Sequence, residues 1–387
     1  MSKQKRRDPL KVMIVWTVVL ALLAVGTWAI GTGLTNYRRA RLAAMREDVQ
    51  NTNTQREQEY QLAVAEFQRE QAATSGANLA WPAQKTEGWD VIDLTNYPLE
   101  NPYTVTATRA DAMHGGLLLV NEWHSRPGDF DESPLVSIGT YARNRSVNFI
   151  GVQNYNQLLH PSAINALIEA LTDAKALGFE HYVINYAYRT YEEQDALFQA
   201  KVTEISQKYG TRYQGDALIA RAKREVNYPG TSEFNTGMSV TLYLYEKGND
   251  ELNKQPFSTS QQGMWLYENS WKYGLIFRFP GADFPLPGTA DKTYKTGVGV
   301  PLNCYRYVGK AHAAVMHHFD LCLEEYIEYL QEHPHIAVFE NGTLKYEIVY
   351  QYVGDDAQSF TVQVTQRARG YSMSLDNMGG VVTVFEY

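Results

Sequence analysis

The feature that most constrains the fold is a run of 23 residues, Val12 to Leu34, that contains no charged side chain. About 20 apolar residues are enough for one helix to cross a membrane. A cleaved signal peptide has a shorter apolar core and a small-residue cleavage site, and AVG and AIG are only weak matches to such a site. The sequence therefore predicts an uncleaved transmembrane helix over 12–34, after a basic cytoplasmic tail over 1–11.

The charges on either side of this run determine its orientation only weakly. Five basic residues precede it, and four arginines follow it by position 46, so a cytoplasmic N-terminus is only slightly favoured. The whole chain carries a net charge of −8 although its N-terminal segment is basic. An acidic body argues against nucleic acid as the main partner.

Residues 35–75 are predicted to form a helical stalk. The segment is polar, and two apolar stripes at helical spacing run along it: Leu42, Met45 and Val49, then Tyr60, Val64 and Phe67. A stalk-mediated dimer is an alternative, although the polar stretch NTNTQRE interrupts the seam that a coiled coil needs.

The rest of the chain divides into a linker over 76–114, a main domain over 115–333 and a β-rich tail over 334–387. In the main domain the patterns predict strands over 115–121, 180–188, 239–245 and one ending at 308, and helices over 161–178, 191–210, 216–226, 258–273 and 310–331. In the tail, Asn341–Gly342 is a good hairpin turn. The mixed order of elements indicates an α+β fold.

Four segments of the main domain form a series whose order is informative. They are YAYRTYEEQ (186–194), PGTSEFNTGMSVT (229–241), WLYENSWKYGLIFRFP (265–280) and TGVGVPLNCYRYVG (296–309). In this order they resemble the conserved segments of VanY-type D-alanyl-D-alanine carboxypeptidases, which belong to the lysostaphin, D-Ala-D-Ala and hedgehog metallopeptidase group. The resemblance spans about 115–330 and implies a VanY-like D-Ala-D-Ala metallopeptidase fold.

The resemblance also implies a chemistry. These enzymes hold one zinc ion with two histidines and an aspartate, and a glutamate serves as general base. They act on the D-Ala-D-Ala ends of peptidoglycan stem peptides, outside the cytoplasm. Such a site needs about three nitrogen, sulfur or oxygen ligands and one open position for water, whose proton the carboxylate takes.

This chain departs from the family at each of those positions. The two histidines fall at Phe234 and Cys304, the aspartate at Thr241 and the general base at Pro301. Phenylalanine offers no lone pair, a neutral hydroxyl is a poor zinc ligand, and one cysteine does not make a site. Glu233 is expected on the opposite face of a strand, and no HxxxH or HExxH spacing occurs. The sequence therefore predicts no catalytic residues and no cofactor, because the family's zinc is lost.

Two residues of the family's binding apparatus remain, Arg189 and Ser232. Arg189 stands where the family's arginine lies near the substrate carboxylate, and a guanidinium there can hold a carboxylate bidentately. The alternative is that both residues now stabilise the fold. Arg278 and Arg306 are expected to be structural and to pair with acids such as Glu324 or Glu325.

The two cysteines, Cys304 and Cys322, add two open questions. Cys304 is either a new nucleophile in the former cleft or a small buried hydrophobe, and the sequence shows no partner base. The sequence also does not decide whether the two cysteines form a disulfide.

Together these patterns predict a membrane-anchored, extracytoplasmic pseudoenzyme of a Gram-positive-like bacterium, which binds peptidoglycan stem peptides or another envelope protein. One alternative is an active D-Ala-D-Ala carboxypeptidase with an atypical site. Another is an assembly protein that works through its stalk and tail.

Overall fold

The computed structural model describes residues 81–387. The predicted basic tail (1–11), transmembrane helix (12–34) and stalk (35–75) lie outside the described residues. Within 81–387, no helix has the length and apolar character needed to cross a membrane.

A five-stranded sheet forms the centre of the domain that carries the motifs, with strand order β4-β6-β7-β9-β8. Its strands are β4 (Gly151–Val152), β6 (Tyr182–Ile184), β7 (Ser239–Leu244), β9 (Cys304–Tyr307) and β8 (Leu275–Phe277). Only β4 and β6 pair in parallel; the other pairs are antiparallel. Helix α4 (Pro161–Ala176) starts at a proline in its first turn and packs its apolar face, including Ile164 and Leu167, into the core with Leu242 of β7.

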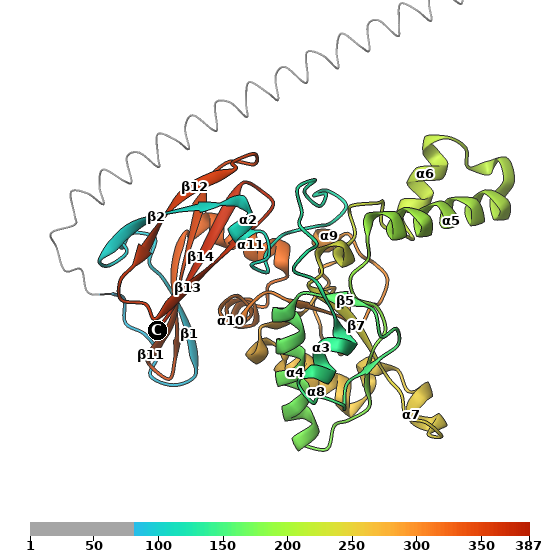
Figure 1. The fold of residues 1–387 in the computed structure, drawn as a ribbon, viewed down its shortest axis with the longest axis horizontal. Helices are drawn as coiled ribbons and strands as arrows, with labels where there is room; N and C mark the ends of the chain where they lie inside the picture. The colour runs from blue at the N-terminus through green and yellow to red at the C-terminus, as the bar shows by residue number, and fades with distance from the viewer. Residues whose placement is uncertain (1–80) are drawn as a thin grey trace, which may run out of the picture. The chain divides into compact units, whose positions relative to one another are not determined.

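Two helices form a hairpin between the first two motif segments. Helix α5 (Tyr191–Tyr209) and helix α6 (Asp216–Lys223) share a small core of their own around Phe198, Ile205 and Ala222. Figure 1 shows this pair projecting from the rest of the domain. Helix α5 starts directly after Arg189 and Thr190, and α6 ends shortly before Gly230. The two ends of the hairpin therefore connect to the first and the second motif segment.

The smaller elements complete the domain. They are α3 (Ile138–Asn144), α7 (Asp250–Lys254), α8 (Gln261–Asn269), α9 (Thr293–Thr296), and the short strands β3 (Val136–Ser137) and β5 (Leu158–Leu159); the 3-10 helices are η1 (Gly210–Arg212), η2 (Glu233–Thr236), η3 (Phe257–Thr259) and η4 (Ser270–Tyr273).

A second five-stranded sheet has the order β1-β10-β11-β14-β13, and β2 pairs separately with β12. Its strands are β1 (Trp89–Asp93), β10 (His335–Glu340), β11 (Thr343–Tyr352), β14 (Gly380–Glu386) and β13 (Gly370–Leu375); the separate pair is β2 (Pro102–Thr108) and β12 (Ser359–Thr365), and α2 (Arg109–Ala112) follows β2. The stretch predicted as a linker thus contributes two strands that pair with the C-terminal tail, about 250 residues away in the chain. The described residues 81–387 belong to one compact unit.

Several predicted elements differ from the structure. The helix expected over 258–273 is divided into η3, α8 and η4, and the strand expected over 180–188 is only the short β6. Residues 115–121, expected as a strand, are buried but irregular, because the Arg306 guanidinium binds the carbonyl oxygens of Gly116 and Leu118 in place of a neighbouring strand. The long helix expected over 310–331 is two helices, α10 (Lys310–Phe319) and α11 (Leu323–Glu332), because Asp320 adopts a left-handed conformation with φ 53°. Helix α10 contacts both five-stranded sheets.

Candidate functional site

The segment that carries the first zinc-ligand position is not a strand over its whole length. Glu233 to Thr236 form the 3-10 helix η2, and Gly237 ends it in the left-handed conformation with φ 67°, after which β7 begins. The prediction that strand alternation places Glu233 on the far face is therefore wrong. The turn of η2 instead places Glu233 in the protein interior, where the residue is 4% exposed.

Three of the four altered family positions come close together. Thr241 on β7 and Cys304 on β9 are register partners in the antiparallel ladder. Phe234, Cys304 and Phe279 form one buried apolar cluster, against which Val298 and Leu302 pack. The fourth position, Pro301, is exposed in the loop before β9. The fold thus brings together three of the positions that the resemblance assigned to the zinc centre, and Phe234 and Cys304 make a hydrophobic contact there.

The side chains at these positions do not fit a zinc ion. The hydroxyl of Thr241 accepts a hydrogen bond from the backbone N–H of Tyr186 at 3.1 Å. Burial raises the pKa of the Cys304 thiol far above its ordinary value, and the charge of Glu233 raises it further, so the thiol stays protonated. In the part of the chain that the structure describes, no three His, Cys, Asp or Glu residues are grouped so that they could hold a metal ion.

Cys304 and Cys322 are both free thiols and both buried. The open question of a disulfide is thereby answered in this structure. A buried, protonated thiol inside an apolar cluster behaves as a small hydrophobe, which is the alternative to the nucleophile that the sequence left open.

The histidines of the described residues do not replace the missing ligands. His312 is buried in hydrogen-bonding contact with the hydroxyl of Tyr326 at 2.7 Å, and burial lowers its pKa to about 3. His317 stacks on Trp271. His114 stacks on His160 with ring centroids 5.4 Å apart, a pair that the sequence did not reveal because their positions are far apart in the chain.

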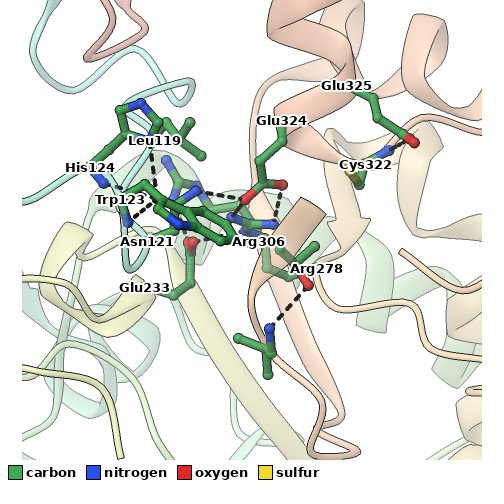
Figure 2. Close-up of polar contacts among 12 residues, drawn as sticks. Leu119, Asn121, Trp123, His124, Glu233, Arg278, Arg306, Cys322, Glu324 and Glu325 are labelled. Carbon is green, nitrogen blue, oxygen red and sulfur yellow. Dashed lines mark hydrogen bonds and ion pairs between the residues drawn. The ribbon is translucent and has the colours of Figure 1, made fainter. Parts of the chain in front are cut away.

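Beneath the apolar cluster lies a buried ionic network of two glutamates and two arginines, shown in Figure 2. Arg278 bonds Glu233 Oε2 through Nε at 2.8 Å, and it holds Glu324 with both terminal nitrogens, at 2.9 and 2.7 Å. Arg306 pairs with the other oxygen of Glu233. Arg278 and Arg306 are both fully buried, as the charge balance with two buried glutamates permits.

This network determines the protonation state of Glu233 and therefore whether it can act as a general base. Burial by itself would raise the pKa of Glu233, but the charges of Arg306 and Arg278 outweigh it and lower the pKa to about 2. A carboxylate held in that way is a poor proton acceptor, so Glu233 does not replace the missing general base. These contacts fit the prediction that Arg278 and Arg306 are structural and that Glu324 is one of their partners. The other expected partner, Glu325, instead pairs with Lys292 at 2.9 Å.

Arg189 lies at the edge of the same cluster. Its guanidinium lies 5.3 Å from the ring centre of Phe234 and 5.8 Å from that of Tyr186. Its terminal nitrogen donates to the neutral amide oxygen of Gln194 at 2.8 Å, and it forms no ion pair within the described residues. Burial lowers the pKa of Arg189, and the nearby charges of Tyr186 and Glu193 offset this only in part. A half-buried cation without an acid is suited to an anionic ligand.

Ser232, the second predicted binding residue, is buried, unlike the half-buried Arg189. It is 1% exposed and caps η2, with its backbone N–H donating to the Asn235 amide oxygen at 3.3 Å. Asn235 in turn donates to the carbonyl oxygen of Arg189 at 2.6 Å. In this structure Ser232 therefore supports the backbone next to Arg189 and does not present its hydroxyl to solvent.

The fold and this arrangement of positions define a class of zinc-peptidase-like protein, and comparisons with known proteins identify the family. The VanY family, described as D-alanyl-D-alanine carboxypeptidase, matches residues 156–309. A D-alanyl-D-alanine carboxypeptidase of Enterococcus faecium is 32% identical over 287 residues, which cover 74% of this chain and 80% of the relative. The putative carboxypeptidase YodJ of Bacillus subtilis is 31% identical, over 60% of this chain and 77% of YodJ.

Among solved structures, the vancomycin-resistance D,D-dipeptidase VanXYg in complex with a D-Ala-D-Ala phosphinate analog shares the fold. It has a TM-score of 0.53 at 21% identity, over 74% of this chain and 99% of that one. This chain belongs to the VanY-type D-alanyl-D-alanine carboxypeptidase family. The resemblance inferred from the motif series is thus confirmed.

Proposed function

We propose that this protein is a catalytically inactive member of its family, which binds the C-terminal carboxylate of peptidoglycan stem peptides in the former active-site cleft. The observation that carries the proposal is the state of Arg189, a half-buried guanidinium whose hydrogen-bond acceptor is the neutral Gln194. Loss of the zinc and general-base residue types at Phe234, Thr241, Pro301 and Cys304 removes the chemistry of hydrolysis but leaves this cation in place.

A titration tests this proposal. The ligand is a peptide ending in D-Ala-D-Ala, and its matched control is the same peptide with an amidated C-terminus. A charge-assisted hydrogen bond contributes about 1.5–3 kcal/mol, so we expect amidation or Arg189→Gln to weaken binding by roughly 10- to 100-fold. Arg212→Gln, on η1 at the far end of α5, serves as the matched variant and should bind normally. Equal binding by the Arg189 variant would contradict a role for this cation, and would favour the other proposed partner, an envelope protein.

The similarity to relatives described as carboxypeptidases supports a second candidate, an active D-Ala-D-Ala carboxypeptidase with an atypical site. The relative from Enterococcus faecium is described as a D-alanyl-D-alanine carboxypeptidase and matches 74% of this chain. That candidate predicts release of free D-alanine from the same peptide and loss of this release with a chelator. The inactive protein predicts no release above the rate of the peptide alone.

We also propose that the domain is held outside the cytoplasm by a single membrane helix over 12–34. The length of the uncharged run and the extracellular location of peptidoglycan support this proposal. Protease added to intact protoplasts should remove the domain and leave an N-terminal fragment in the membrane. Full protection of the domain until the membrane is opened would contradict this topology.

A further inference from the structure

A cavity of about 290 Å³ opens between the second five-stranded sheet and the helices η4 and α10, and none of its lining residues belongs to the cluster around Phe234. Helix α10 contacts η4 and the strands β1, β10 and β11, and so joins the two sides of the cavity. Small-molecule sites measure roughly 300–1,000 Å³, so this cavity suits a small ligand. It is lined by three aromatic side chains, Trp89, Trp271 and Tyr346, and by three charged ones, Lys272, Lys310 and Glu340.

The three aromatic side chains are half-buried and form a fixed apolar wall. Trp89 and Trp271 meet edge to face, with ring centroids 5.5 Å apart and an angle of 85° between the ring planes. Trp271 stacks on His317 with centroids 4.3 Å apart, and its indole N–H donates to the carbonyl oxygen of Glu268 at 3.0 Å. Both tryptophans and Tyr346 pack against the core beneath them. A ligand therefore meets a wall that needs little ordering on binding.

The same cavity offers hydrogen-bond donors that the protein does not use. Within residues 81–387, the indole N–H of Trp89 and the hydroxyl of Tyr346 form no hydrogen bond, and both reach solvent. Lys272 donates to the neutral side chain of Asn269 at 2.7 Å and has two further N–H groups. An indole N–H and an ammonium group can only donate, so a ligand of this cavity must supply acceptors.

The charges around the cavity argue against a strongly charged ligand. Lys310 already pairs with Glu169 at 2.8 Å, and Glu340 pairs with Lys345 at 3.0 Å. Of the charged side chains that line the cavity, only the exposed Lys272 forms no ion pair with a residue that the structure describes. A multiply charged ligand such as a nucleotide would therefore find little complementary charge here.

We propose that this cavity binds one ring of an oligosaccharide. A sugar ring has C–H faces that pack on aromatic side chains, and its hydroxyl or acetamide oxygens accept hydrogen bonds. It is also uncharged. These three properties match the aromatic wall, the free donors and the balanced charge of the cavity. The proposal does not rest on peptide binding at Arg189, which does not line this cavity.

Isothermal titration calorimetry of the full-length protein with the N-acetylglucosamine tetramer tests the proposal, because this sugar combines C–H faces with acetamide acceptors. We expect the wild type to bind it. Trp89→Ala removes part of the wall and should weaken binding by about tenfold or more. Tyr346→Phe keeps the ring and its packing and removes only the hydroxyl, so it should weaken binding by roughly 2- to 10-fold. Tyr103→Phe, at an exposed tyrosine of β2, is the matched variant and should bind as the wild type does.

Three results would overturn the proposal. The first is no binding of the tetramer by the wild type at millimolar sugar. The second is equal affinity in the wild type, Trp89→Ala and Tyr346→Phe, because the sugar would then be bound elsewhere. The third is displacement of the sugar by an excess of the peptide that ends in D-Ala-D-Ala, which would place the sugar in the former active-site cleft. None of these results bears on peptide binding at Arg189, which the separate peptide titration tests.

Discussion

At the scale of single residues, Glu233 shows how a buried charge beside the altered positions is stabilised in the core. Its two oxygens bind Arg278 and Arg306, and Ser239 donates a further hydrogen bond at 2.6 Å. Removing one partner of a buried ion pair leaves uncompensated charge in the interior, which usually costs about 3–5 kcal/mol. We expect Glu233→Gln to lower the free energy of unfolding by this amount, measured by denaturant titration.

The matched control for that substitution is Glu328→Gln. Glu328 also pairs with a base, Lys295, but its side chain is 49% exposed. Surface pairs contribute about 0–1 kcal/mol, so the control should change stability by no more than that. Comparable losses of unfolding free energy in both variants would mean that the buried network stabilises the fold no more than a surface ion pair does.

The cysteines provide a second residue-scale prediction. Cys304 is 0% and Cys322 2% exposed, and burial raises the pKa of both thiols, that of Cys322 to about 12. Because the thiolate is the reactive form, neither should react with a thiol reagent in the native protein at neutral pH, and both should react after denaturation. Rapid labelling of Cys304 in the native state would contradict this expectation and would support the alternative that Cys304 is a nucleophile.

At the scale of elements, the side chain of Gln194 joins the helical hairpin α5–α6 to Arg189, the residue proposed to bind the peptide. Gln194 lies in the first turn of α5 and is 1% exposed. Its side chain accepts a hydrogen bond from Arg189 and donates one to the carbonyl oxygen of Asn227 at 2.6 Å. Gln194 therefore connects the two ends of the hairpin. We expect Gln194→Ala to leave buried groups unsatisfied, to cost about 1–3 kcal/mol of stability and to weaken peptide binding.

Gln199→Ala is the control on the same helix, since Gln199 bonds only the side chain of Asp195 at the surface. It should affect neither stability nor binding, measured by the same denaturant and peptide titrations. Normal peptide binding by Gln194→Ala would show that Arg189 needs no positioning by the hairpin.

The elements also show which parts of the structure local sequence can reveal. Helices α4 and α5 were predicted within two residues of their observed ends, because helical periodicity and N-terminal caps are local signals. Strands β1 and β2 were missed because they pair with partners far along the chain, a pairing that no local pattern reveals. The break between α10 and α11 was missed because no Gly or Pro marks it; a single residue, Asp320, adopts the left-handed conformation there.

At the site, motif order predicts which positions stand in place of the family's zinc ligands, and Phe234, Thr241 and Cys304 do lie close together in the structure. The contacts around these positions were not predictable: the packing of Phe234 on Cys304 and the pairing of the neighbouring Glu233 with two arginines join residues up to 73 positions apart. Such contacts depend on the tertiary arrangement, which no local pattern encodes.

At the scale of the whole molecule, the buried network makes stability depend on pH. Glu233 has a folded-state pKa of about 2, below its ordinary value of 4.5, so its contribution is present above pH 4.5 and is lost as the pH falls towards 2. The stability difference between wild type and Glu233→Gln, measured by denaturant titration, should therefore shrink as the pH is lowered from 4.5 to 2. A difference that stays constant over this range would show that Glu233 is not ionised in the fold.

The measurement that tests the central claim most directly is the metal content of the protein. The full chain would be incubated with zinc, freed of unbound metal, and analysed for zinc per chain, with a chelator-treated sample as the reference. The altered positions Phe234, Thr241 and Cys304 offer no zinc ligand set, so we predict no zinc above the reference. About one tightly held zinc ion per chain would contradict the loss of the family's metal centre and would support an active enzyme.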